Sequence, residues 1–179
     1  MVKKLNFPTI LTILRMILVV PFLIFLMVGW YWPALVIFVV AAVTDKIDGD
    51  MARKRKQVTD LGKFLDPLAD KMLVNSAFLA LAVMGIVPIW VFALILWRDF
   101  AVDGIRMMIA RNGETVAASM WGKLKTTTQM VALVALMLNL IIASGILATV
   151  GTVLLYLALG LTLYSGADYL IKGWPKAIK

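Results

Sequence analysis

Four aspartates between residues 45 and 70 stand at helical spacings in a stretch of sequence that is otherwise small or apolar. At about 100° per residue, Asp45 and Asp48 lie within roughly 60° of each other on one side of a helix. Asp66 and Asp70 are about one helical turn apart and form a second stripe in the next segment. If these two helices face each other, four carboxylates meet in one space, where they persist only by binding cations or protons. The spacing therefore predicts a metal site.

The chemistry of that metal is limited by composition, because the sequence contains no histidine and no cysteine. Imidazole and thiolate ligands are excluded, so the ligands would be oxygens, as Mg²⁺, Mn²⁺ and Ca²⁺ prefer. Asp45 and Asp48 would also lie near a helix C-terminus, where the helix dipole disfavours carboxylates and positive charge must compensate them. Two divalent cations would do so, and two-metal sites often serve displacement at phosphorus. The alternative, four solvated helix-end charges at a membrane surface, is disfavoured by the spacing.

Small residues share the two stripes with the aspartates. Gly49, Ala52 and Gly62 either let two membrane helices touch or leave room for a nucleotide or a diphosphate, and their positions do not separate the two interpretations. Arg53 precedes a basic run at residues 54–56, which we interpret as a loop that binds lipid head groups. Arg53 itself fits either the loop or the site.

The composition indicates an integral membrane protein, with 63% hydrophobic residues, 16% charged residues and a mean hydropathy of +0.96. We expect an all-α protein with six transmembrane helices in a single domain over residues 1–179. A net charge of +8 then favours anionic lipid head groups and phosphorylated substrates as partners, and not nucleic acid. The six apolar segments are centred near residues 10–28, 34–52, 67–85, 88–109, 122–143 and 147–170.

The charge pattern predicts the orientation of these segments. Three stretches contain no Asp, Glu, Lys or Arg: residues 16–44, 72–97 and 126–167. We interpret each as the part of a helical hairpin that lies toward the far side of the membrane. The basic residues lie on the opposite side, so by the positive-inside rule both termini face the cytoplasm. Because the charge-free stretches are short, Asp45, Asp70 and Arg98 should lie below the membrane surface, where charges normally face a bundle interior or a watery space. We expect a polar cavity in the inner leaflet that opens to the cytoplasm.

Basic residues also gather around the expected cytoplasmic ends of the fourth and fifth helices: Arg98, Arg106, Arg111, Lys123 and Lys125. Topology alone explains Arg111. Arg98 and Arg106 lie roughly 80° apart around one helix, and phosphate binding is at least as good an interpretation as pairing with Asp99 or Asp103. Lys123 and Lys125 are ambiguous individually.

Read as a string, Asp45-x2-Asp48-Gly49-x2-Ala52-Arg53-x8-Gly62-x3-Asp66-x3-Asp70 resembles the signature of the CDP-alcohol phosphotransferase family at every fixed position. Residues 98–106 and 122–126, with Gln129, extend the resemblance. It implies a six-helix fold, usually a homodimer, in the cell membrane with the active site toward the cytoplasm. It also implies transfer of a substituted phosphoryl group from CDP-diacylglycerol to a polar alcohol.

The resemblance gives each matching position an expected role. The metal ligands, for two Mg²⁺ or Mn²⁺ ions, would be Asp45, Asp48, Asp66 and Asp70. Asp70 would also act as the catalytic base on the attacking hydroxyl. The residues expected to line the cytidine diphosphate site are Asp48, Gly49, Ala52, Arg53 and Gly62.

Within the family, the chain looks like the members whose acceptor is sn-glycerol 3-phosphate and whose leaving group is CMP. Arg106, Lys123 and Lys125 are our candidates for the acceptor's phosphate. Three positions depart from the usual pattern: Thr9 follows Pro8 where Pro-Asn is common, Asp99 stands where Glu is common, and Asp103 stands where a small residue is usual. Serine, an inositol phosphate or phosphatidylglycerol are alternative acceptors.

A divalent-cation transporter is a further alternative, since acidic residues inside a membrane also mark ion paths. A transporter should carry polar features to the far side of the membrane and often has paired repeats. The charge-free far halves and the lack of a visible repeat favour the enzyme.

Overall fold

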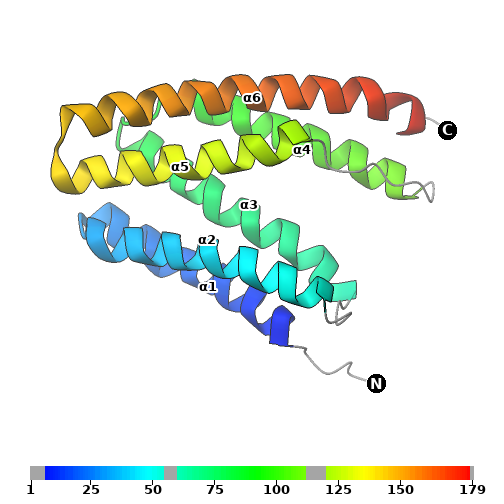
Figure 1. Ribbon diagram of the computed structural model, residues 1–179, viewed down its shortest axis with the longest axis horizontal. Helices are drawn as coiled ribbons and strands as arrows, with labels where there is room; N and C mark the ends of the chain where they lie inside the picture. Colours follow the sequence, from blue (N-terminus) through cyan, green and yellow to red (C-terminus); the bar gives the residue numbers. More distant parts are fainter. Residues whose placement is uncertain (1–6, 55–59, 112–119, 178–179) are drawn as a thin grey trace. The chain divides into compact units, whose positions relative to one another are not determined.

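A computed structural model describes the backbone of residues 7–54, 60–111 and 120–177, and the side chains of residues 10–44, 68–69, 71–111 and 120–175. Within these ranges the chain forms helices and no strand (Figure 1). The helices are α1 (Phe7–Val28), α2 (Tyr31–Lys54), α3 (Asp60–Val83), α4 (Ile89–Arg111), α5 (Met120–Ile142) and α6 (Gly145–Ala177). The all-α prediction is confirmed, and each helix overlaps one of the expected apolar segments.

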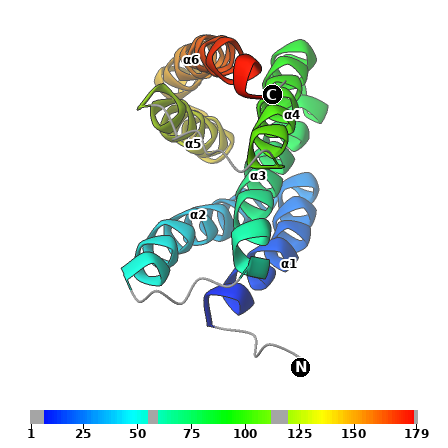
Figure 2. The same ribbon diagram turned by 90° about the vertical axis from the view of Figure 1, so that its right-hand side faces the viewer.

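The chain divides into two compact units, Met1–Ala80 and Leu81–Lys179. In the first unit, α1 and α2 form an antiparallel hairpin (Figure 2). Its core includes the fully buried rings of Phe22 and Phe38, whose centroids are 5.8 Å apart, together with Leu26. Burial of these large apolar side chains holds the hairpin together.

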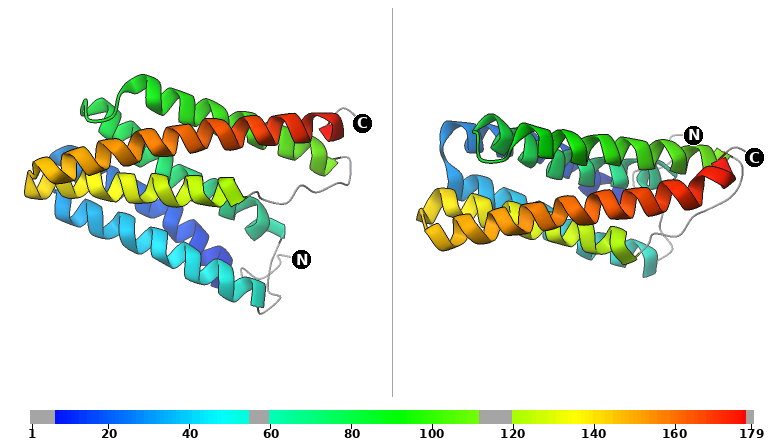
Figure 3. Two further views of the ribbon diagram at one scale, coloured as in Figure 1. Left: turned by 45° about the horizontal axis from the view of Figure 1, so that its top comes forward. Right: turned by 90° about the horizontal axis from the view of Figure 1, so that it is seen from above.

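In the second unit, α6 packs along both α4 and α5 (Figure 3). Leu133 and Met137 of α5 and Leu155 of α6 are buried. A β-carbon added at Gly151 would lie 2.7 Å from Cδ2 of Leu136, so α6 approaches α5 closely only because this residue is glycine. The end of α4, the start of α5 and the end of α6 lie at the same end of this unit.

Residues with positive φ follow three of the helices. Gly29 (φ 89°) and Gly85 (φ 74°) each follow a helix in a Schellman arrangement, in which the glycine N–H and the next N–H donate back to carbonyls of the last turn. Ala143 (φ 51°) directly follows α5, and its N–H donates to the carbonyl of Asn139 at 2.9 Å. Tight turns therefore join α1 to α2, α3 to α4 and α5 to α6, at the helix ends that carry no charged residues.

Three helices of the described chain are long and apolar enough to cross a membrane, over Ile10–Val28, Met120–Ile142 and Gly145–Pro175. Tyr31–Thr44 and Lys71–Val83 are shorter apolar helical segments. Together they make this a multi-pass membrane protein. α4 carries five charged residues, from Arg98 onward, and is not among these segments, so the expected six spans stay a prediction.

Candidate active site

The helices expected to carry the aspartate pattern are present. α2 continues without a break to Lys54, and α3 begins at Asp60, so Asp45 and Asp48 lie on one helix and Asp66 and Asp70 on the next. The helical periods that underlie the two stripes are therefore confirmed at the level of the backbone. The side chains of these aspartates, and those of Gly49, Ala52, Arg53 and Gly62, lie outside the described residues, and their convergence stays a prediction.

The donor set on α2 and α3 fits a hard divalent cation. All four candidate ligands are carboxylates, and the sequence contains no histidine or cysteine that would favour a softer metal. Among the side chains that the structure describes, no three acids lie close enough together to hold a metal ion. The pattern on α2 and α3 is thus the candidate metal centre.

A buried ionic cluster joins α4 to α5 in the second unit. The ammonium of Lys125 donates to Oδ1 of Asp99 at 2.5 Å, and Nη1 of Arg98 donates to the same oxygen at 3.1 Å. The side chains of Arg98, Asp99 and Lys125 are 12%, 8% and 7% exposed. One carboxylate therefore fixes two cations inside the helical bundle, where such pairs are screened little by solvent.

The third helix of the unit anchors this cluster through Arg98. Its Nε donates to the carbonyl of Thr162 at 3.1 Å, and its Nη2 donates to Oγ of Ser165 at 2.9 Å. A β-carbon at Gly166 would lie 2.7 Å from Cγ of Arg98, so glycine makes room for the arginine stem against α6. Of the two interpretations of Arg98, pairing with Asp99 is the one that the structure shows.

A second polar contact ties α5 to α6 beside this cluster. Nε2 of buried Gln129 donates to Oγ1 of Thr162 at 3.2 Å, and that hydroxyl donates to the carbonyl of Ala158 at 2.5 Å. Each polar group thus gains a partner in an otherwise apolar interior, where an unpaired one is costly. The arrangement fixes the positions of α4, α5 and α6 around Lys125.

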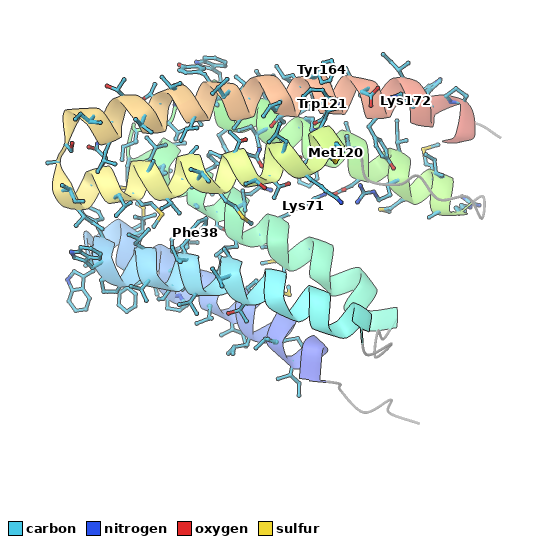
Figure 4. All side chains as sticks on the ribbon, in the orientation of Figure 1. Phe38, Lys71, Met120, Trp121, Tyr164 and Lys172 are labelled. Carbon is cyan, nitrogen blue, oxygen red and sulfur yellow. The ribbon has the colours of Figure 1, made fainter. Side chains whose placement is uncertain are left out.

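The remaining basic candidates are more exposed than Arg98 and Lys125. Arg106 is exposed and lies over the ring of Tyr169, with 5.6 Å between the guanidinium carbon and the ring centroid. Lys123 and Arg111 are exposed near the same end of the unit. Figure 4 labels Trp121 and Tyr164, which pack edge to face on α5 and α6 beside this end. Exposed cations there are available to a soluble anion.

Sequence reasoning missed the α6 side of the site. Thr162, Ser165 and Tyr169 did not stand out, since hydroxyls in an apolar helix usually bond to the preceding turn. The helical spacing of Thr162, Ser165 and Gly166 within one charge-free segment could have indicated them. It places two hydroxyls and a residue without a side chain on neighbouring faces of the helix. Nothing in that spacing identifies Arg98 as the partner.

In the first unit, two polar residues of α1 are buried. Thr12 is 2% exposed and Arg15 is 4% exposed. Both belong to the N-terminal element in which the sequence departs from the family pattern at Thr9, a residue whose side chain lies outside the described residues. A buried arginine in an apolar helix normally faces other helices and not lipid.

The comparisons identify the class of protein. The family model described as CDP-alcohol phosphatidyltransferase matches residues 5–164. The chain therefore belongs to this family, and it is an enzyme of the CDP-alcohol phosphatidyltransferase type, as the aspartate pattern indicated. Members of the family are generally dependent on divalent cations, in agreement with the donor set on α2 and α3.

Individual relatives extend over almost the whole chain. A Bacillus subtilis protein named CDP-diacylglycerol--glycerol-3-phosphate 3-phosphatidyltransferase is 36% identical, with 94% of this chain and 95% of the relative covered. A Haemophilus influenzae protein of the same name is 38% identical, with 93% and 92% covered. A Mycobacterium tuberculosis protein named probable phosphatidylglycerophosphate synthase is 39% identical, with 93% and 81% covered.

Proposed function

We propose that the protein transfers the phosphatidyl group of CDP-diacylglycerol to the 1-hydroxyl of sn-glycerol 3-phosphate, which yields phosphatidylglycerophosphate and CMP. The observation that carries this proposal is the intact aspartate pattern in a chain that matches relatives of this named activity over more than nine tenths of its length. The basic residues Arg106, Lys123 and Lys125 support a phosphorylated acceptor, since Arg and Lys bind phosphate through charge-assisted hydrogen bonds.

The reaction is a direct displacement at the phosphorus that bears diacylglycerol. The carboxylate of Asp70 takes the proton of the attacking hydroxyl, the new P–O bond forms to glycerol 3-phosphate, and the bond to CMP breaks. Asp48, with the four residues Gly49, Ala52, Arg53 and Gly62, holds the cytidine diphosphate part of the donor. Two Mg²⁺ or Mn²⁺ ions, held by Asp45, Asp48, Asp66 and Asp70, would neutralise charge on the diphosphate.

The acceptor is held by basic residues of the second unit. Arg106 and Lys123 are exposed and can reach a soluble phosphate, and Lys125 lies deeper on the same helix as Lys123. An ammonium has three N–H donors, so Lys125 can bond to Asp99 and to further partners at once. Serine has no phosphate for these cations, so the cluster favours glycerol 3-phosphate over serine.

The protein's setting is part of the same proposal. Six membrane crossings of a single domain would place both termini and the active site on the cytoplasmic side of the cell membrane, by the positive-inside rule. The donor would then enter from the lipid and the acceptor from the cytoplasm. The resemblance to the family also leads us to propose a homodimer.

Turnover by the purified full-length protein tests the function. CMP release and lipid product are measured with CDP-diacylglycerol, Mg²⁺ or Mn²⁺, and one acceptor at a time: glycerol 3-phosphate, serine, an inositol phosphate or phosphatidylglycerol. We expect CMP release only with glycerol 3-phosphate, and its loss in Asp70→Asn but not in Asp50→Asn. Asp50 is the matched control because it lies about 140° from Asp45 around the helix, off the aspartate stripe. CMP release with a different acceptor would contradict the proposal.

A further inference from the structure

We infer that Asp99 is a positioning residue for acceptor binding, which fixes the ammonium of Lys125 so that it meets the acceptor's phosphate. The inference rests on the proposed function and assigns Asp99 a role in it. Asp99 itself does not touch the substrate, because a carboxylate would repel a phosphate. It acts through the two cations that it holds.

The bond to Asp99 restricts the position of the Lys125 ammonium. Lys125 has a flexible four-carbon stem, and an ammonium on such a stem samples many positions unless a partner holds it. The 2.5 Å bond from Lys125 Nζ to Asp99 Oδ1 supplies that partner from the neighbouring helix. Both side chains are more than nine tenths buried, so little water competes for the bond.

Asp99 is itself held in place. The same oxygen accepts a bond from Nη1 of Arg98 at 3.1 Å, and Arg98 is anchored to α6 through Thr162 and Ser165. A continuous chain of contacts therefore runs from α6 through Arg98 and Asp99 to Lys125 on α5. Each link is an ionic or hydrogen-bonded contact, so the position of the ammonium is set by three helices.

The charge at position 99 matters more than the length of the side chain. Asp99 is one methylene shorter than glutamate, and a glutamate at this position could still reach both cations by rotation of its longer stem. An asparagine keeps the shape and an acceptor oxygen but carries no charge, so it would hold the two cations far more weakly than a carboxylate does. The charge of Asp99, and not its volume, is thus the property on which the position of Lys125 depends.

A double-mutant cycle on the full-length protein tests this role, with steady-state KM and kcat as the readouts. Asp99→Asn should raise KM for glycerol 3-phosphate about 10- to 100-fold and leave KM for CDP-diacylglycerol unchanged. Asp99→Glu should keep KM for glycerol 3-phosphate within about threefold of the wild type. Because Asp99 acts through Lys125, Asp99→Asn combined with Lys125→Met should be no worse than Lys125→Met alone.

Leu136→Ala serves as the structural control, because it removes a buried side chain from the α5–α6 interface without touching the ionic cluster. It should lower the thermal midpoint and leave both KM values unchanged. If Asp99→Asn behaves like this control, or if its effect multiplies with that of Lys125→Met, the inference is wrong. Where Asp99→Asn alone does not fold, the double variant compared with Lys125→Met alone decides the question in the same way.

The wild type separates this inference from the proposed function. A wild-type protein that uses another acceptor and not glycerol 3-phosphate would contradict the function itself. A wild type that uses glycerol 3-phosphate, with an Asp99→Asn variant of unchanged KM, would overturn only the role of Asp99.

Discussion

The guanidinium carbon of Arg106 lies 5.6 Å from the centre of the Tyr169 ring, a cation–π contact that joins α4 to α6. Tyr169 is 6% exposed, and its buried hydroxyl makes no hydrogen bond to any part of the chain that the structure describes. The ring therefore holds Arg106 in place without help from the hydroxyl. The contact orients a cation that we propose to bind the acceptor's phosphate.

Two substitutions of Tyr169 should distinguish the role of its ring from that of its hydroxyl. Because an exposed cation–π contact contributes about 0.5–1 kcal/mol, Tyr169→Leu should raise KM for glycerol 3-phosphate about two- to fivefold. Tyr169→Phe keeps the ring and should leave KM unchanged. Initial rates over a range of acceptor concentrations measure both variants, and an equal effect of the two would contradict the role of the ring.

Loss of the Arg106 charge should weaken acceptor binding more strongly. Hydrogen bonds to charged groups contribute about 1.5–3 kcal/mol, so Arg106→Gln should raise KM for glycerol 3-phosphate about 10- to 100-fold. Arg111→Gln is the matched control, an exposed arginine at the end of the same helix, and should have little effect. KM for glycerol 3-phosphate is measured for both variants with CDP-diacylglycerol near saturation. Equal KM values for the two variants would remove Arg106 from the acceptor site.

A β-carbon at Gly166 should displace Arg98. The added atom of Gly166→Ala would lie 2.7 Å from Cγ of Arg98, near the rigid start of the side chain, so Arg98 must shift away from α6. We expect the thermal midpoint in detergent to fall, with a loss of about 1–3 kcal/mol typical of overpacked sites. Gly160→Ala on the same helix meets no atom within 4 Å and should be neutral or stabilising. A midpoint for Gly166→Ala equal to that for Gly160→Ala would contradict this packing.

The turn between α5 and α6 offers a stabilising change. Ala143 has a φ of 51°, a conformation that costs an L residue about 1–2 kcal/mol and costs glycine nothing. Ala143→Gly should therefore raise the thermal midpoint, although part of the gain is offset by the greater freedom of glycine in the unfolded chain. Ala93→Gly, at an exposed position inside α4, should instead lower it. Thermal unfolding monitored by circular dichroism compares the two.

Metal dependence should follow the aspartate stripe. We expect chelation by EDTA to abolish turnover and excess Mg²⁺ or Mn²⁺ to restore it. Asp48→Asn removes a proposed ligand and should raise the metal concentration needed for half-maximal rate by at least about 10-fold, since loss of even an outer-shell partner costs about 10- to 100-fold. Asp50→Asn, two residues away and off the stripe, should match the wild type. Turnover that survives chelation would exclude a metal role for the stripe.

Much of the helical framework could be predicted from sequence, because each helix is a long apolar run bounded by charges or by turn residues. Gly29 and Gly85 stand at two of these boundaries and adopt the positive φ that ends a helix. The helix bounds differ mainly at the ends: α6 continues past the expected residue 170 to Ala177, and α3 begins at Asp60, ahead of the expected residue 67. Helix ends are governed by local caps and packing, which hydropathy does not report.

The sequence alone determined the membrane character of the protein, the helical spacing of its four aspartates and its resemblance to a family. These properties depend on residue type and on distances along one chain segment, which are local. Only the tertiary structure decided that Arg98 pairs with Asp99, that Asp99 also holds Lys125, and that Ser165 anchors the group from α6. Arg98 and Ser165 are 67 residues apart, and a contact between them depends on how α6 packs against α4, a relation that spacing along the chain does not encode.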